Sequence, residues 1–291
     1  MRIFDPHIHM TSRTTNDYQQ MYAAGVRALV EPSFWVGQPR TSVGTFIDYF
    51  DGLVGWEPFR AGQFGIRHHC TIGLNPKEAN DPRCREVLDI LPRYLAKDSV
   101  VAVGELGYDA MTADEDTVFA AQLELAKEHE LPALVHTPHR DKAAGTRRTL
   151  DVVRESGIAP ERVIVDHLNE VTADIVAGSG CWMAFSIYPD TKMDEGRMVR
   201  ILQEYGTEGM LVNSAADWGK SDPLKTHKTA SAMLAAGFSD DDVDKVVWGN
   251  PVAFYAQSGK LELEGQDETA ADAAATFAGN SVLRGARPEA S

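Results

Sequence analysis

The chain has 291 residues, of which 43% are hydrophobic, and a formal net charge of −15 at pH 7. This length and apolar content suffice for one large domain or two small ones. The acidic balance disfavours a tight, sequence-independent nucleic-acid binder because phosphates would be repelled, although it allows a local cationic pocket for one phosphate. Three widely spaced cysteines, no signal-peptide pattern and no membrane-length apolar run together predict a cytoplasmic protein without a membrane span.

Short apolar stretches alternate along the chain with polar loops and helical segments. This alternation predicts a single (β/α)8 barrel of parallel strands, with a doubly wound open sheet as the alternative. The open sheet usually carries a Gly-rich phosphate loop after its first strand, and here the sequence His-Ile-His stands in that place. The predicted strands span residues 2–8, 28–32, 69–74, 100–105, 133–136, 163–167, 181–187 and 210–214. The predicted helices span residues 18–24, 83–96, 114–129, 146–156, 170–177 and 194–205.

An insertion rich in aromatic residues follows the second predicted strand and spans residues 33–67. One interpretation is a lid that supplies apolar walls to a substrate pocket, because loops after barrel strands build the active-site face. The other is an ordinary helix with an apolar core stripe, and we favour it for most of the insertion. Trp35 and Trp56 are kept as candidate pocket residues. The core stripe would consist of Phe46, Tyr49, Phe50 and Leu53.

The carboxyl-terminal part of the chain differs in composition from the rest. We expect the barrel to span residues 1–259 and a carboxyl-terminal extension to span residues 260–291. An acidic, alanine-rich segment near residue 266 is typical of a linker or a short helix. The stretch 277–285 is more apolar than a disordered end normally is, so docking on the barrel and disorder are both open.

Residues of metal-ligand type stand at the ends of five predicted strands. His7 and His9 are two positions apart on the first strand, which places both side chains on one face. Imidazole and carboxylate groups are favoured ligands of zinc and related ions, and barrel strand ends meet at one mouth. Each residue alone has a structural explanation, such as a core histidine or a helix N-cap, but the joint pattern predicts a metal site. The set is His7, His9, Glu105, His136, His167 and Asp217.

Two divalent metal ions suit six ligands better than one ion does. With Glu105 as the bridge, the first site would add His7, His9 and Asp217, and the second would add His136 and His167. Ions about 3.5–4 Å apart can share a hydroxide and polarise a carbonyl or phosphoryl oxygen. Asp217 is then the candidate to take a proton from the bridging water and to pass it to the leaving group. Zinc is the first choice of metal, with manganese, iron, nickel and magnesium as alternatives.

The stretches Phe-Asp-Pro-His-Ile-His at residues 4–9 and Gly-Glu-Leu-Gly-Tyr-Asp at residues 104–109 resemble the TatD-like metal-dependent hydrolases of the amidohydrolase superfamily. The histidines after the fifth and sixth strands and the eighth-strand aspartate match as well. The resemblance reaches residues 249–255, which are similar to the closing helix of that family. It implies a TIM barrel, divalent metals and hydrolysis, often described as DNA exonuclease activity.

Two departures from the resemblance bear on the substrate. Asn75 stands where TatD-like nucleases usually carry a histidine, and Ala215-Ala216-Asp217 replaces the usual Glu-Thr-Asp. We therefore predict hydroxide attack on an ester, amide or phosphoester bond of a small molecule. A 3′-directed DNA exonuclease is the alternative, with nucleic acid disfavoured as a partner. A metal-binding barrel that acts as a non-catalytic pathway component is a third interpretation, disfavoured because a binding module needs no open metal position.

Substrate contacts are predicted next to the metal ligands. Asn75 is one candidate, and His139 is another that could assist proton transfer. Arg140 and Lys142 after the fifth strand, and Lys192 after the seventh, are candidates to hold an anionic group, with a solvated loop charge as the alternative for each. The sequence leaves the oligomeric state open.

Overall fold

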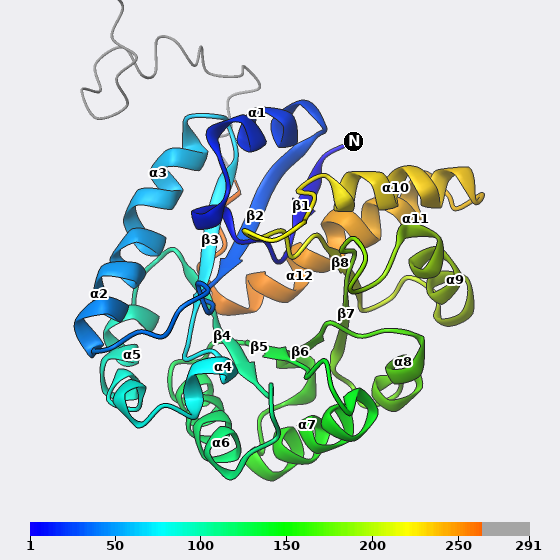
Figure 1. Ribbon diagram of the computed structural model, residues 1–291. Coiled ribbons are helices and arrows are strands. Elements are labelled where there is room, and N and C mark those ends of the chain that lie inside the picture. The colour runs from blue at the N-terminus through cyan, green and yellow to red at the C-terminus, as the bar shows by residue number, and fades with distance from the viewer. Residues whose placement is uncertain (264–291) are drawn as a thin grey trace, which may run out of the picture.

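The structure is a computed structural model and describes residues 1–263. Its eight strands form one sheet in the order β1 to β8, and each strand pairs in parallel with the next (Figure 1). Backbone hydrogen bonds join the two ends of the sheet, because Ala215 donates to the carbonyl of His7 at 2.9 Å and His9 donates to that of Ala216 at 2.8 Å. The predicted (β/α)8 barrel is confirmed, and the open-sheet alternative is wrong.

Every predicted strand overlaps an observed strand, and the helices form a ring around the barrel (Figure 1). The strands are β1 Ile3–Asp5, β2 Val26–Pro32, β3 Arg67–Ile72, β4 Val100–Gly107, β5 Ala133–His136, β6 Val163–Asp166, β7 Trp182–Ser186 and β8 Met210–Asn213. The helices are α1 Thr15–Ala23, α2 Val43–Asp51, α3 Glu57–Gly62, α4 Pro76–Ala79, α5 Val87–Leu95, α6 Ala113–Glu128, α7 Lys142–Ser156, α8 Glu170–Val176, α9 Glu195–Tyr205, α10 Lys225–Ala235, α11 Asp240–Asp244 and α12 Asn250–Tyr255.

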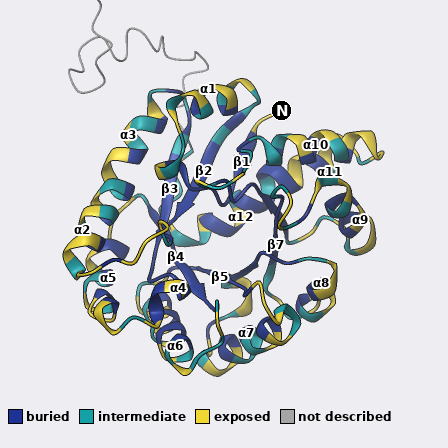
Figure 2. Cartoon of the chain, viewed as in Figure 1, coloured by how far each residue is buried: buried dark blue, intermediate teal, exposed yellow. Residues whose placement is uncertain are grey.

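Two apolar layers hold the barrel together. The larger lies between the strands and the surrounding helices, whose outer faces are exposed (Figure 2). The smaller fills the barrel interior with side chains such as Phe4 and Leu134, and includes Phe254 and Tyr255 of α12. Tyr255 stacks on Phe4 and donates its hydroxyl hydrogen to the carbonyl of Pro6 at 2.8 Å. Because Phe4 lies before the ligand residues of β1, α12 closes the end of the barrel opposite the predicted site.

The insertion after β2 is mainly helical, with α2, a π-helical turn at Gly52–Trp56 and α3 in succession. Phe46, Phe50 and Leu53 are buried in the large core, which confirms the core-stripe interpretation for these three. The prediction that Trp56 lines a pocket is wrong. Its side chain is 44% exposed and packs beside Phe59 on the outer surface.

The described beginning of the carboxyl-terminal extension lies against the barrel. Lys260 donates to the carbonyl of Leu95 at 2.5 Å, and the Glu262 amide donates to Nε2 of His69 at 3.2 Å. Leu261 and Leu263 pack on the interior cluster. The apolar stretch 277–285 lies outside the described residues, and the domain boundary at residue 259 stays a prediction. Within residues 1–263, no helix has the length and apolarity that a bilayer span requires.

Candidate metal centre

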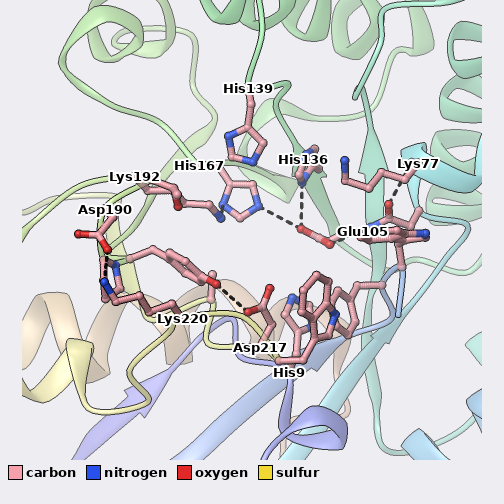
Figure 3. A pocket seen from close by; sticks show the side chains of 18 residues that line it. His9, Lys77, Glu105, His136, His139, His167, Asp190, Lys192, Asp217 and Lys220 are labelled. Carbon is pink, nitrogen blue, oxygen red and sulfur yellow. Dashed lines mark hydrogen bonds and ion pairs between the residues drawn. The ribbon is translucent and has the colours of Figure 1, made fainter. Parts of the chain in front are cut away.

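The carboxyl ends of the strands open into a cavity of about 620 Å³. Its polar part is formed by histidines and a glutamate, and Figure 3 shows Glu105, His136 and His167 turned toward one another there. Its apolar part comes from Phe34 and Trp35, which follow β2, together with further aromatic side chains from the loops after β7 and β8. The cavity therefore combines ligand-type groups with walls that limit the access of water.

Glu105 is the central residue of the site. A Cβ atom on the preceding Gly104 would lie 2.7 Å from the carbonyl of Leu134, so only glycine allows β4 to approach β5 so closely. Glu105 Oε1 lies 3.2 Å from Nδ1 of His136 and 3.1 Å from Nε2 of His167. Its Oε2 accepts a hydrogen bond of 3.0 Å from the Asn75 amide.

The charge state of Glu105 follows from these neighbours. Its carboxylate is almost fully buried, with 3% exposure. Burial alone would raise its pKa, but His7, 3.5 Å away, and the bonds from His136 and His167 outweigh burial and hold the pKa well below its usual range. Glu105 is therefore ionised at neutral pH and available to a cation.

His7 and His9 meet in an arrangement that calls for a cation between them. His7 Nδ1 lies 2.6 Å from the Asp166 carboxylate and His9 Nδ1 lies 3.2 Å from the carbonyl of Pro32, so each Nδ1 carries the hydrogen. In the neutral rings both Nε2 atoms then present lone pairs, and these two atoms are 3.0 Å apart. Facing lone pairs repel each other unless the two nitrogens share a proton or bind the same metal ion. The donor set thus fits a metal.

The histidines of β5 and β6 form the second half of the centre. Nε2 of His136 is buried and has no hydrogen-bond partner among residues 1–263. Nδ1 of His167 lies 2.6 Å from the Ser186 hydroxyl, which leaves Nε2 facing Glu105. His167 has φ of +60°, an unfavourable backbone conformation of the kind that clusters at functional sites.

Ligand atoms in the described part of the chain gather in four groups, of which two share Glu105. Within one group, all ligand atoms lie within 4.8 Å of one another. Two of the groups are His7, His9 and Glu105, and Glu105, His136 and His167. The structure therefore brings together five of the six predicted ligands, in the division that the sequence predicted around Glu105.

Asp217 lines the same cavity but belongs to none of these ligand groups. Its Oδ1 accepts hydrogen bonds of 2.8 Å from the Tyr188 hydroxyl and of 2.8 Å from the Gly219 amide. The reason for the offset is local. β8 ends at Asn213, and the loop that follows turns at Ala215, with φ of +42°, before it reaches Asp217. Asp217 therefore stands apart from the two groups around Glu105, and both its roles, as a metal ligand and in proton transfer, stay predictions.

The predicted substrate contacts divide between two hollows. Asn75, His139 and Lys192 line the 620 Å³ cavity. Arg140 does not, because it lies in a neighbouring hollow beside Met111. The role of Arg140 in substrate binding therefore stays a prediction.

Sequence reasoning overlooked Asp166, which lies next to the ligand His167. Its carboxylate binds Nδ1 of His7 at 2.6 Å and accepts from the Asn213 amide at 3.0 Å. Burial would raise its pKa, but His167 and His7 outweigh burial and hold that pKa well below its usual range. The available signal was an acidic residue directly before a ligand histidine at a strand end. Asp166 orients His7 so that Nε2 faces the centre.

The aromatic walls were only partly foreseen. Phe34 stacks on the His9 ring with a centroid distance of 3.6 Å, and Trp35 meets Trp218 at 6.0 Å. Tyr188 from the loop after β7 completes the wall. From the insertion after β2, Phe34 and Trp35 line the cavity.

The family described as TatD related DNase matches residues 4–255 of the chain. The chain belongs to the TatD family. An uncharacterized metal-dependent hydrolase of Methanocaldococcus jannaschii is 26% identical to this TatD-family chain over 259 residues, which are 87% of this chain and 99% of the relative. Taken with the ligand groups, these matches show that the chain is a metal-dependent hydrolase.

Solved structures agree with the family assignment. The crystal structure of a TatD-like protein from Archaeoglobus fulgidus has a TM-score of 0.74 and 26% identity to this TatD-family chain, with 87% of this chain and 99% of that chain covered. A phosphotriesterase homology protein from Escherichia coli, crystallised with phosphate in its active site, has a TM-score of 0.63 and 16% identity, with 87% and 98% covered. The second similarity supports the fold alone.

Metal binding by this TatD-family chain is expected to depend on pH in a defined direction. Burial, together with nearby positive charge, keeps the pKa values of His9 and His167 well below the usual histidine value, so both rings are neutral at pH 7. Burial also opposes protonation of His7, but Glu105 and Asp166 outweigh it and raise its pKa. As the pH falls, His7 is therefore the first of these rings at which a proton competes with the metal for the ring nitrogen.

We expect metal to stay bound at about pH 8 and to begin to dissociate before the pH falls to about 6.5, the ordinary pKa of histidine, because the pKa of His7 is raised. Elemental analysis after dialysis at a series of pH values measures this release. A metal content that stays constant down to about pH 4 would contradict histidine ligation.

Proposed function

We propose that this hydrolase cleaves an ester, amide or phosphoester bond of a small molecule at a centre of two divalent metal ions. The observation that carries the proposal is the cavity of about 620 Å³, which has the ligand groups on one side and aromatic side chains on the other. Pockets of this volume with mostly apolar walls and a few convergent polar groups are typical of small-molecule sites.

The residues divide into two ligand groups that share one carboxylate. His7, His9 and Glu105 would hold the first ion, and Glu105, His136 and His167 would hold the second. Zinc is the preferred metal for imidazole and carboxylate ligands, with manganese, iron, nickel and magnesium as alternatives. When bound, such ions activate water and polarise the bond to be cleaved.

The chain itself supplies orientation and proton transfer. The Asn75 amide holds Oε2 of Glu105 at 3.0 Å and so fixes the plane of the shared carboxylate. Both hydrogen bonds to the Asp217 carboxylate fall on Oδ1, so within the described residues Oδ2 has no donor and is available to take a proton. Figure 3 shows the Asp217 carboxylate at the cavity, opposite His167. This placement supports Asp217 as the general base.

A DNA substrate is the second candidate, because the family is described as TatD related DNase. The charges around the cavity favour a small molecule instead. Lys77 pairs with Asp109 at 2.7 Å and Lys220 pairs with Asp190 at 2.5 Å, so neither offers an uncompensated charge to a phosphate backbone. The net charge of −15 adds a general repulsion.

The test compares labelled single-stranded oligonucleotide with a panel of nitrophenyl esters and phosphoesters, each with zinc, manganese or magnesium. We expect measurable hydrolysis of small esters and little or no trimming of the oligonucleotide. His7→Ala should abolish the activity, and His129→Ala, at the outer end of α6, should retain it. Oligonucleotide trimming that His7→Ala abolishes, with the ester panel silent, would make the exonuclease the better account.

A further inference from the structure

We propose that the substrate carries a compact anionic group, a phosphate or a carboxylate, and that Lys142 and Lys192 hold this group in a side pocket next to His167. The inference rests on the proposed function, because it names one part of the substrate.

The side pocket has a volume of about 180 Å³ and lies between the loops after β5 and β7. Four of its lining residues, His139, His167, Thr191 and Lys192, also line the main cavity. Figure 3 shows His139 and Lys192 beside His167, on the side of the cavity away from His9. A molecule whose reacting bond lies at Glu105 could therefore extend one substituent into the side pocket.

Most cations near the cavity already have a carboxylate partner. Lys77, Lys220 and Arg197 pair with Asp109, Asp190 and Glu170 respectively. Within residues 1–263, by contrast, neither Lys142 nor Lys192 forms an ion pair. In an acidic protein, two cations left unpaired beside one pocket indicate a site for an anion.

Asp166 is the acidic group near the two lysines, and its carboxylate oxygens are already hydrogen-bonded to other residues. Asp166 acts electrostatically on both Lys142 and Lys192. Each of its two oxygens, however, already takes part in two hydrogen bonds: Oδ2 with Nδ1 of His7 and the Asn213 amide, and Oδ1 with the Asn213 amide and the backbone amide of His167. Asp166 therefore lacks a free acceptor position that would satisfy either ammonium group.

Lys192 is half-buried, and its ammonium group lies 3.1 Å from Nδ1 of His167. That contact is a hydrogen bond only while Nδ1 of His167 carries no hydrogen. A metal bound at Nε2 would place the hydrogen of the neutral ring on Nδ1, which would then donate to Ser186 at 2.6 Å and no longer accept from Lys192. The remaining contact is the Tyr188 ring, whose centroid lies 5.5 Å away. The ammonium group thus still needs an acceptor, which a substrate anion would provide.

Lys142 occupies a place that local stability does not explain. It is the first residue of α7, where the helix dipole disfavours positive charge. Burial lowers its pKa to about 8, and Lys192 adds to that effect. Its ammonium group contacts two neutral oxygens, the Thr137 hydroxyl at 3.1 Å and the Pro138 carbonyl at 3.3 Å. An anion between the two lysines would compensate both the dipole and the burial.

The test is calorimetric binding of inorganic phosphate, and separately of acetate, to the full chain with metal bound and after chelation. We expect Lys142→Met and Lys192→Met each to weaken binding of the preferred anion about tenfold or more, also after chelation, since charge-assisted hydrogen bonds are lost. Lys142→Arg should restore part of the affinity, and Lys127→Met, on the outer face of α6, should bind as the wild type does. Because methionine removes a buried charge, Lys142→Met should melt no lower than the wild type, which separates loss of binding from loss of folding.

A second arm distinguishes failure of the subsite from failure of the hydrolase. The ratio of kcat/KM for mono-nitrophenyl succinate to that for nitrophenyl acetate should fall about tenfold in Lys142→Met. Phosphate and acetate binding unaffected by Lys142→Met, with esters still hydrolysed, would overturn the subsite and leave the proposed function. Anion binding that depends on Lys142, with no small ester hydrolysed, would support the subsite and count against the proposed function.

Discussion

Glu105→Gln is expected to release bound metal and to lower kcat/KM by at least about a thousandfold, which corresponds to about 4 kcal/mol of transition-state stabilisation. The reason is that one carboxylate oxygen lies within 3.5 Å of ring nitrogens from three histidines, His7, His136 and His167. A neutral amide is a poor bridge between two cations, so both ligand groups lose their shared member. Elemental analysis and ester hydrolysis on the same preparation measure the two effects.

The matched control is Glu31→Gln. Glu31 is also a buried glutamate on a barrel strand, and its Oε2 lies 2.8 Å from Nε2 of His68. Glu31, Glu57 and His68 form a separate group that shares no residue with the groups around Glu105, and Arg60 pairs with Glu57 at 2.8 Å. The Glu31→Gln variant should therefore keep the metal that is bound at the Glu105 centre. Retained metal and activity in Glu105→Gln would show that another carboxylate holds the centre.

Asp217→Asn is expected to keep the metal and to lower kcat by about a hundredfold to ten-thousandfold, the usual range for loss of a general base. Metal should stay because Asp217 lies outside both ligand groups, and turnover should fall because the amide cannot accept the proton. The rate loss should appear mainly in kcat, with KM changed little.

A second variant examines how Asp217 is held. Tyr188→Phe removes the 2.8 Å hydrogen bond to Oδ1 but leaves the one from the Gly219 amide. We expect a smaller loss of kcat than in Asp217→Asn, together with a shifted pH profile, since the bond to the carboxylate helps to set its basicity. Loss of metal in Asp217→Asn would instead restore the aspartate to the ligand set.

The barrel and most of the metal centre could be predicted because both depend on local sequence. Alternation of apolar strands with helices is a short-range pattern, and the end of a parallel strand determines where its next side chain lies. His7, His136 and His167 needed nothing more than their place at a strand end. Glu105 was also marked by the glycine before it, which the close approach of β4 and β5 requires.

The features of the site that the sequence did not predict depend on contacts between segments that are distant in the chain. Asp166 orients His7 from a position 159 residues away, and only the closed barrel brings the two together. Asp217 is displaced from the ligand groups by the path of a loop rather than by its distance in sequence from β8. Trp56 could not be assigned a side because the insertion is a helix whose orientation on the barrel is set by packing. The charge environment of Lys142 and Lys192 likewise emerges only when the loops after β5 and β7 meet.

The most direct test of a shared-carboxylate metal centre is an anomalous difference map from crystals of the metal-loaded protein, recorded on both sides of the absorption edge of the metal. The account predicts two peaks, one beside His7 and His9 and one beside His136 and His167, with the Glu105 carboxylate between them. A single peak that Glu105 does not contact, or peaks elsewhere in the chain, would contradict it.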